Sequence, residues 1–280
     1  MQKRMMCALL TILGSSAHGQ WVNYPTPGTP RTRDGKPNLA APAPKASNGK
    51  ADLSGVWHVQ PTPLAEQLRL FGKDADKVTV PGMEIDTISK YGINILADFK
   101  PGEVGMLPEA QAEFNRRRGQ SGDHSPLAGC LPAGIPLATL LSEVHKIVQT
   151  PGLMLIMHEL DSLTRQIYTD GRKLPADPSP SWLGYSAGKW EGDTLVVETV
   201  GFNDKSWLDA GGHPRSEAMH LQERYRRRDF GHLDVTITVD DPKTYTKPFT
   251  IKVTHLLQAD SDILEYVCGE NEKDRAHMVK

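Results

Sequence analysis

The sequence predicts a mostly β protein in which an antiparallel meander closes into a barrel. The second half of the chain contains many short segments of strand length, and in 233–239 apolar residues alternate with Asp and Thr as in a half-buried strand. Tight-turn sequences such as Asp170-Gly171 separate these segments. Short strands joined in chain order form a meander, and closure into a barrel removes its exposed edges.

The first residues, 1–19, predict a secretory signal peptide. Lys3 and Arg4 precede the apolar segment 5–13, and small residues follow at Ala17 and Gly19. We therefore expect a periplasmic or secreted protein. No other segment approaches the roughly 20 apolar residues that a membrane-spanning helix needs.

Residues 20–52 predict a Pro-rich arm, because they contain many Pro, Ala, Gly, Lys and Asn residues and few that form a core. Within the arm, 34–40 (DGKPNLA) is echoed by 48–54 (NGKADLS), which predicts two similar turns that fix the arm to the rest of the protein. One barrel domain, 53–280, follows, with a helical insertion at about 61–143. Two helices are expected in the insertion, at 64–71 and 108–118.

The first strand is predicted at 53–59, and the others follow residue 144. We expect these at 146–149, 153–160, 165–169, 184–190, 194–200, 221–227, 233–239, 249–256 and 263–268.

Two cysteines, Cys130 and Cys268, remain once Cys7 leaves with the predicted signal. An even pair in an oxidising compartment predicts a disulfide, and the alternative is two buried thiols. The formal net charge of the whole chain is −2, without the basic excess typical of nucleic-acid binding proteins.

Four glutamates stand in strand-like segments in which apolar residues occupy positions two or four residues away on the same face. Residues i and i+2 of a strand share a face, so these carboxylates are predicted to point away from water. A buried carboxylate needs a counter-ion, a hydrogen-bond donor, a raised pKa or a ligand. The four are Glu159, Glu198, Glu223 and Glu265.

Arg165 is the cation expected to point inward, because it shares a strand face with Ile167, and its guanidinium can pair with a glutamate through two hydrogen bonds. Such a pair can be purely structural. Among the catalytic candidates, Glu159 and Glu223 would transfer protons, Arg165 would orient or stabilise an anion, and His158 or His220 could carry protons. The histidines lack the spacing of a metal motif, so no metal and no cofactor is predicted.

Aromatic residues near the polar turns suit a sugar or aryl ligand, although each could instead fill the core. With Glu198 and Glu265, the substrate-binding candidates are Tyr168, Trp182, Tyr185, Trp190 and Tyr225.

Two further features have alternative readings. Residues 184–188 match the G-x-S-x-G pattern of a hydrolase, but a β-hairpin rather than a helix is predicted to follow, so the glycines are better explained by a bend in a strand. The irregular stretch 203–219, with Asp204, His213 and Glu217, could form a lid over the barrel mouth.

The segment Gly55-Val56-Trp57 on a first strand resembles the Gly-x-Trp start of lipocalin-type (calycin) barrels, and 190–197 (WEGDTLVV) is similar to hairpins in these proteins. The resemblance implies a lipocalin-like barrel. The whole chain also resembles an uncharacterised family of exported bacterial proteins, through 165–172 (RQIYTDGR) and 265–271 (EYVCGEN), and this likeness implies no activity.

Two functions are therefore predicted. The first is an exported enzyme that uses acid and base catalysis without a redox cofactor, a lyase, isomerase or hydrolase acting on a small carbohydrate or aromatic molecule. The second is a non-catalytic, lipocalin-like protein for small-molecule ligand binding. Convergence of the four glutamates on one cavity would favour the enzyme.

Overall fold

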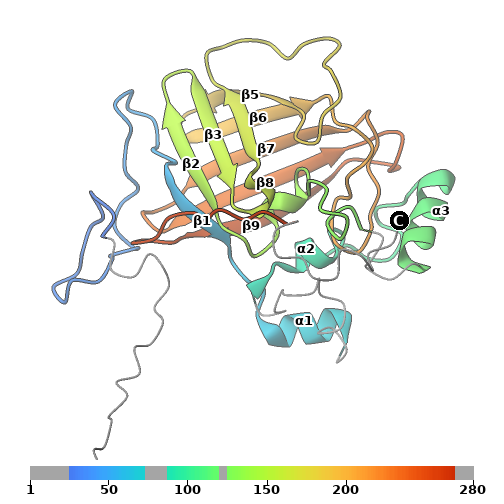
Figure 1. The fold of residues 1–280 in the computed structure, drawn as a ribbon, viewed down its shortest axis with the longest axis horizontal. Coiled ribbons are helices and arrows are strands. Elements are labelled where there is room, and N and C mark those ends of the chain that lie inside the picture. The colour runs from blue at the N-terminus through green and yellow to red at the C-terminus, as the bar shows by residue number, and fades with distance from the viewer. Residues whose placement is uncertain (1–24, 73–86, 120–124, 269–280) are drawn as a thin grey trace, which may run out of the picture.

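The computed structural model describes residues 25–72, 87–119 and 125–268; the predicted signal peptide lies outside these ranges. The nine strands close into one barrel, in which β9 pairs with β1 (Figure 1). The chain therefore has the lipocalin-like fold class that the sequence predicts. The strands are β1 (Gly55–Val59), β2 (His145–Thr150), β3 (Leu153–His158), β4 (Thr164–Tyr168), β5 (Tyr185–Glu191), β6 (Thr194–Val200), β7 (His220–Arg227), β8 (His232–Asp240) and β9 (Phe249–Leu257).

The predicted strands match β1 to β9 closely, but the prediction of a further strand at 263–268 was wrong. That segment follows β9 as irregular chain and pairs with no strand. The physical reason is closure. Because β9 already pairs with β1, the sheet has no free edge left to accept another strand.

Strands β4 and β5 form the one parallel pair in a ring of antiparallel pairs. Two residue pairs join them, Ile167 with Ser186 and Tyr168 with Ala187. The tight turn predicted at Asp170-Gly171 therefore does not join two antiparallel strands; instead the long connection 169–184 returns the chain so that β5 runs parallel to β4. At Gly184 the backbone φ is 67°, in the left-handed region that glycine adopts readily, and the chain leaves the line of β5. We call this short pairing the seam.

The insertion covers the end of the barrel at which β1 ends and β2 begins. Its helices are α1 (Leu64–Phe71), α2 (Lys90–Ile93), α3 (Pro108–Gly119) and the 3-10 turn η4 (Leu137–Thr139); a second 3-10 turn, η5 (Leu160–Ser162), follows β3 (Figure 1). The two predicted helices correspond to α1 and α3. Ile95, Ile135 and Leu140 are fully buried and belong to the same hydrophobic core as the inward residues of the strands.

The N-terminal arm lies against the opposite end and makes the two similar turns that the sequence predicts. Arg31 bridges to Pro37 around the first turn, and Lys45 bridges to Ala51 around the second. Each turn has a glycine with positive φ, 82° at Gly35 and 77° at Gly49.

Arg227 of β7 fastens the arm to the barrel. Its guanidinium donates to the carbonyl oxygens of Asp52 (2.7 Å), Ser54 (3.1 Å) and Phe230 (2.6 Å), and it lies over the rings of Trp57 and Phe230. Burial lowers the pKa of Arg227 to about 10, so the guanidinium stays charged at neutral pH.

The predicted disulfide is present. Cys130 of the insertion and Cys268 are bonded, with Cα atoms 5.5 Å apart across a sequence separation of 138. The bridge ties the insertion to the segment after β9 and constrains a long loop of the unfolded chain.

We predict that Arg227→Leu lowers the free energy of unfolding by about 2–4 kcal/mol, because the carbonyl groups of Asp52, Ser54 and Phe230 lose their donor inside the protein. Urea denaturation followed by fluorescence measures this. Arg226→Leu is the matched control, since Arg226 is exposed on the same strand. Equal losses in the two variants would contradict the role given to Arg227.

Candidate functional site

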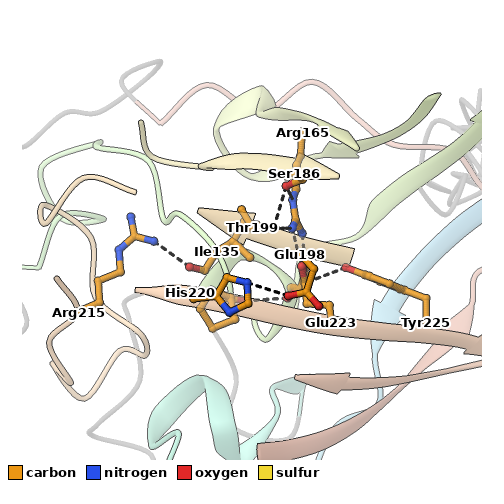
Figure 2. A network of polar contacts seen from close by, with 11 residues as sticks. Ile135, Arg165, Ser186, Glu198, Thr199, Arg215, His220, Glu223 and Tyr225 are labelled. Atoms are coloured by element: carbon orange, nitrogen blue, oxygen red, sulfur yellow. Dashed lines mark hydrogen bonds and ion pairs between the residues drawn. The ribbon is translucent and has the colours of Figure 1, made fainter. Parts of the chain in front are cut away.

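A ladder of polar side chains crosses the barrel interior beneath the seam. It runs from Arg165 on β4 through Ser186 on β5 and Thr199 on β6 to Glu223 on β7 (Figure 2). The guanidinium contacts Glu223 through two hydrogen bonds, Nη1 to Oε1 at 3.1 Å and Nη2 to Oε2 at 2.5 Å. Arg165 is 1% exposed and Glu223 is fully buried at 0%. We call these four residues the polar ladder.

Strand register explains the polar ladder. Ile167 pairs with Ser186, Ser186 with Thr199, and Thr199 with Leu221, so inward positions on four successive strands lie side by side. The predicted inward direction of Arg165 and its two-bond contact with a glutamate are confirmed.

Hydrogen bonds join every member of the ladder to at least one other member. Arg165 Nε donates to Ser186 Oγ at 3.1 Å, Nη2 donates to Thr199 Oγ1 at 2.8 Å, and Tyr225 Oη donates to Glu223 Oε1 at 2.7 Å. Burial lowers the pKa of Arg165, but the charge of Glu223 outweighs it and the net shift is upward. Burial, reinforced by the Glu223 charge, raises the pKa of Tyr225 well above its ordinary value. The arrangement therefore holds a charged pair and a neutral phenol in fixed positions.

The prediction of four buried glutamates holds for Glu223 and was wrong for the other three. Glu159 follows β3 and accepts a hydrogen bond from the backbone of Leu264 at 3.1 Å, outside the barrel. Glu198 alternates with buried neighbours on β6, and its side chain is 32% exposed. Glu265 is exposed on the irregular segment after β9. The four carboxylates do not converge on one cavity.

For Glu159 and Glu198 the error came from apolar residues on both faces of the strands, whereas Glu265 lies on the segment that forms no strand. In β3 the buried positions are Met154, Ile156 and His158, while Leu155 and Met157 face outward and are only partly buried. A strand with apolar residues on both faces carries no period-two signal, so its register cannot be read from hydrophobicity.

A pocket of about 370 Å³ opens beside the seam, where β4 and the chain entering β5 diverge. Its lining brings together the predicted Arg165 and three predicted aromatic residues, Tyr168, Trp182 and Tyr185. We call it the seam pocket. The complete lining is Leu163, Thr164, Arg165, Gln166, Tyr168, Ser181, Trp182, Leu183, Gly184, Tyr185 and Ser186.

The aromatic residues of the seam pocket hold one another in place. The rings of Tyr168 and Tyr185 stack with centroids 5.3 Å apart, and the Arg172 guanidinium lies 3.7 Å from the Tyr168 centroid. The carbonyl oxygen of Trp182 accepts a hydrogen bond from the buried Arg215 at 3.2 Å. Trp190 and Tyr225, the other aromatic residues predicted to bind substrate, do not line this pocket. Trp190 packs on the core, and Tyr225 donates a hydrogen bond to Glu223.

The two predicted proton carriers lie on opposite sides of the barrel wall. His158 is 3% exposed and points inward, whereas the His220 side chain is 42% exposed and pairs with Glu198 at 2.8 Å on the outer surface (Figure 2).

Sequence reasoning did not find a histidine cluster in the barrel interior. His145 on β2, His158 on β3 and His255 on β9 are all buried, and the His145 ring lies 5.5 Å from that of His158 and 4.9 Å from that of His255, centroid to centroid. The signal was available, because each histidine is two positions from a buried aliphatic residue. We call these three residues the histidine cluster.

The other sequence motifs have structural roles. Ser186 of the G-x-S-x-G match lies inside the barrel on β5, bonded to Arg165 and Thr199, and not at a turn before a helix. The stretch 203–219 is fixed against the insertion, since buried Asp209 accepts hydrogen bonds from Ile95 N and from the His213 ring. Asp204 is exposed, and Glu217 pairs with Lys243 at 2.6 Å.

Comparison of the chain with protein-family models, with curated proteins and with solved structures finds no match. Within the described ranges no three His, Cys, Asp or Glu side chains are grouped to hold a metal ion. No helix in the same part of the chain is long and apolar enough to span a bilayer.

We predict that Glu223→Gln lowers the free energy of unfolding by about 3–5 kcal/mol, because the buried Arg165 charge loses its counter-ion. Chemical denaturation at neutral pH measures the change. The matched control is Glu191→Gln, which breaks the exposed pair with Arg224 at 2.9 Å and should cost less than about 1 kcal/mol. A Glu223→Gln variant as stable as the control would show that the buried pair has no structural role.

Proposed function

We propose that the protein is an exported, lipocalin-like binding protein that holds a small neutral ligand in the seam pocket. The observation that carries this proposal is the meeting of Tyr168, Trp182 and Tyr185 in one pocket of about 370 Å³. Pockets of roughly 300–1,000 Å³ are usual for small-molecule ligands. The predicted signal peptide and the Cys130–Cys268 disulfide support export to the periplasm or the medium.

The charge of the pocket lining supports a neutral ligand. Arg165 is the charged residue among those that line it, and Glu223 and the hydroxyls of the polar ladder already engage its guanidinium. Arg172, which lies over Tyr168, is held by Asp170 at 2.6 Å. An anionic or cationic ligand would therefore lose water without gaining a free counter-ion.

The remaining polar groups suit hydroxyl-bearing ligands. Hydroxyl or amide groups of Thr164, Gln166, Ser181 and Tyr185 stand among aromatic and aliphatic surfaces. Such a lining packs against a ring face and exchanges hydrogen bonds with hydroxyl groups, so we propose neutral sugars or phenols as the ligand class.

An acid and base enzyme is the second candidate, favoured by one observation. His158 Nε2 is buried without a hydrogen-bond partner. The charge of Arg165, which lines the pocket, helps to lower the pKa of His158. A neutral imidazole there could exchange a proton with a substrate that reached it. Glu223 is less suited to that role, because both its oxygens are hydrogen-bonded.

We predict that neutral monosaccharides or phenols raise the melting temperature of the protein, and that Trp182→Ala weakens binding at least about tenfold, roughly 1.4 kcal/mol, through loss of the ring surface. Calorimetry measures the affinity, and Trp190→Ala is the matched control outside the pocket. Chromatographic analysis of the mixture separates the two candidates, since turnover would favour the enzyme. If no neutral sugar or phenol binds, or if both tryptophan variants bind equally, the seam pocket is not the site.

A further inference from the structure

The histidine cluster is an unusual feature of the barrel interior because most of its ring nitrogens lack a partner. His145 Nδ1, His158 Nε2 and both nitrogens of His255 are buried without a hydrogen bond. The three residues are 2%, 3% and 1% exposed. A buried polar atom without a partner destabilises the fold by about 1–3 kcal/mol. Three adjacent histidines therefore make this part of the core less stable than apolar residues would.

The histidine cluster lies directly behind the wall of the seam pocket. The backbone N–H of His158 donates to the carbonyl oxygen of Leu163 at 2.7 Å, and Ile156, two residues earlier, pairs with Arg165 across β3 and β4. Leu163 and Arg165 both line the pocket. A change of charge on His158 therefore acts next to a buried cation that belongs to the wall.

The other charged groups around the cluster do not supply a ready counter-ion. From β1, the half-buried His58 adds a fourth imidazole that interacts with His145 and His255. From β4, Arg165 opposes a positive charge on His158, and its partner Glu223 on β7 is already engaged. On η4 the cluster meets the backbone of Ala138, which accepts from the His158 ring.

Two acidic residues lie close to the cluster in sequence, each just beyond the end of a strand that carries one of its histidines. Glu143 before β2 and Asp161 in η5 have raised pKa values, chiefly because burial disfavours their charge, and Glu159 adds to the repulsion at Glu143. Lys146 of β2 is partly exposed and pairs with Asp262 at 2.8 Å.

We propose that the histidine cluster makes the seam pocket release its ligand in acid, because protonation places like charges beside Arg165 and separates the strands that form the pocket wall. The proposal rests on the proposed binding function. The histidine cluster and the seam pocket are separate sites, because the cluster lies in the barrel interior and the proposed ligand lies outside it. Protonation of the cluster would therefore affect ligand binding by moving β3 and β4.

The direction of the pH effect follows from burial. Burial lowers the pKa of His145 from 6.5 to about 3, and it lowers the pKa values of His158 and His255 well below 6.5, with their mutual repulsion adding to the effect. An opened or unfolded chain binds protons at about pH 6.5, whereas the closed barrel does not. The stability of the closed state is thus fully present above about pH 6.5 and falls as the pH drops from there towards 3.

The test compares the chain with His255→Leu and with His232→Gln. His255→Leu removes two unpartnered nitrogens and one titrating ring from the cluster. His232 lies on β8 with a side chain that is 32% exposed and pairs with Asp229 at 2.6 Å, so its loss controls for the removal of a histidine. Urea denaturation between about pH 7.5 and 5 gives the proton uptake on unfolding, and hydrogen exchange at 163–167 reports opening of the pocket wall.

We expect His255→Leu to reduce proton uptake on unfolding by about one proton per molecule. This variant should also stay folded at a pH at which the unmodified chain unfolds, whereas His232→Gln should open in acid as readily as the unmodified chain. Affinity for the neutral ligand should fall at least about tenfold between pH 7.5 and 5.5 in the unmodified protein, and less in His255→Leu.

Two outcomes would overturn the inference. One is equal proton uptake in His255→Leu and the unmodified chain, and the other is a ligand affinity that does not change with pH while binding at neutral pH is intact. Absence of binding at neutral pH would instead contradict the proposed function, and the denaturation and exchange measurements would still test acid opening of the wall.

Discussion

The barrel depends on the salt bridge between Arg165 and Glu223 where β4 meets β5, the strand pair joined by the fewest residue pairs. Two residue pairs join β4 to β5, and the polar ladder spans β4 to β7 beneath them. A buried ion pair adds little net stability compared with apolar residues, but it is costly to break and has strict geometry. We infer that the ladder specifies how the seam closes. Arg165, the charged residue that lines the seam pocket, is therefore already paired with Glu223.

Two further buried guanidinium groups hold irregular chain against this barrel. Arg227 holds the arm through carbonyl oxygens, and Arg215 donates to Ile135 at 2.9 Å and to Trp182 at 3.2 Å. Burial lowers the pKa of each of these two arginines to about 10, which leaves them charged at neutral pH. Through Arg215, the position of Trp182 in the seam pocket is coupled to the insertion that covers the barrel end. The irregular segment that carries Trp182 is thereby held by rigid neighbours.

The sequence was sufficient for the barrel, because turn residues and alternating strands are local signals, and for the two longer helices, because charge placement along a helix is local. The disulfide followed from an even cysteine pair in a chain with a predicted signal peptide. It also placed Arg165 and Glu223 inside, since their strands carry a clear alternation. It failed for Glu159 and Glu198, where apolar residues occupy both strand faces and no local signal sets the register. The parallel seam depends on the path of the long connection 169–184, for which the sequence carries no local signal. The inward direction of each histidine could be predicted from its aliphatic neighbours, but the meeting of His255 with His145 requires knowing that β1 pairs with both β2 and β9.

A double-mutant cycle on Arg165→Met and Glu223→Leu tests the central claim most directly, with unfolding free energy as the readout. If the two charges form one buried structural unit, each single variant should lose about 3–5 kcal/mol. The double variant should then be clearly more stable than the sum of the two losses allows, because neither charge is left alone. Additive losses would show that the two side chains act independently, and the account of the seam would be wrong.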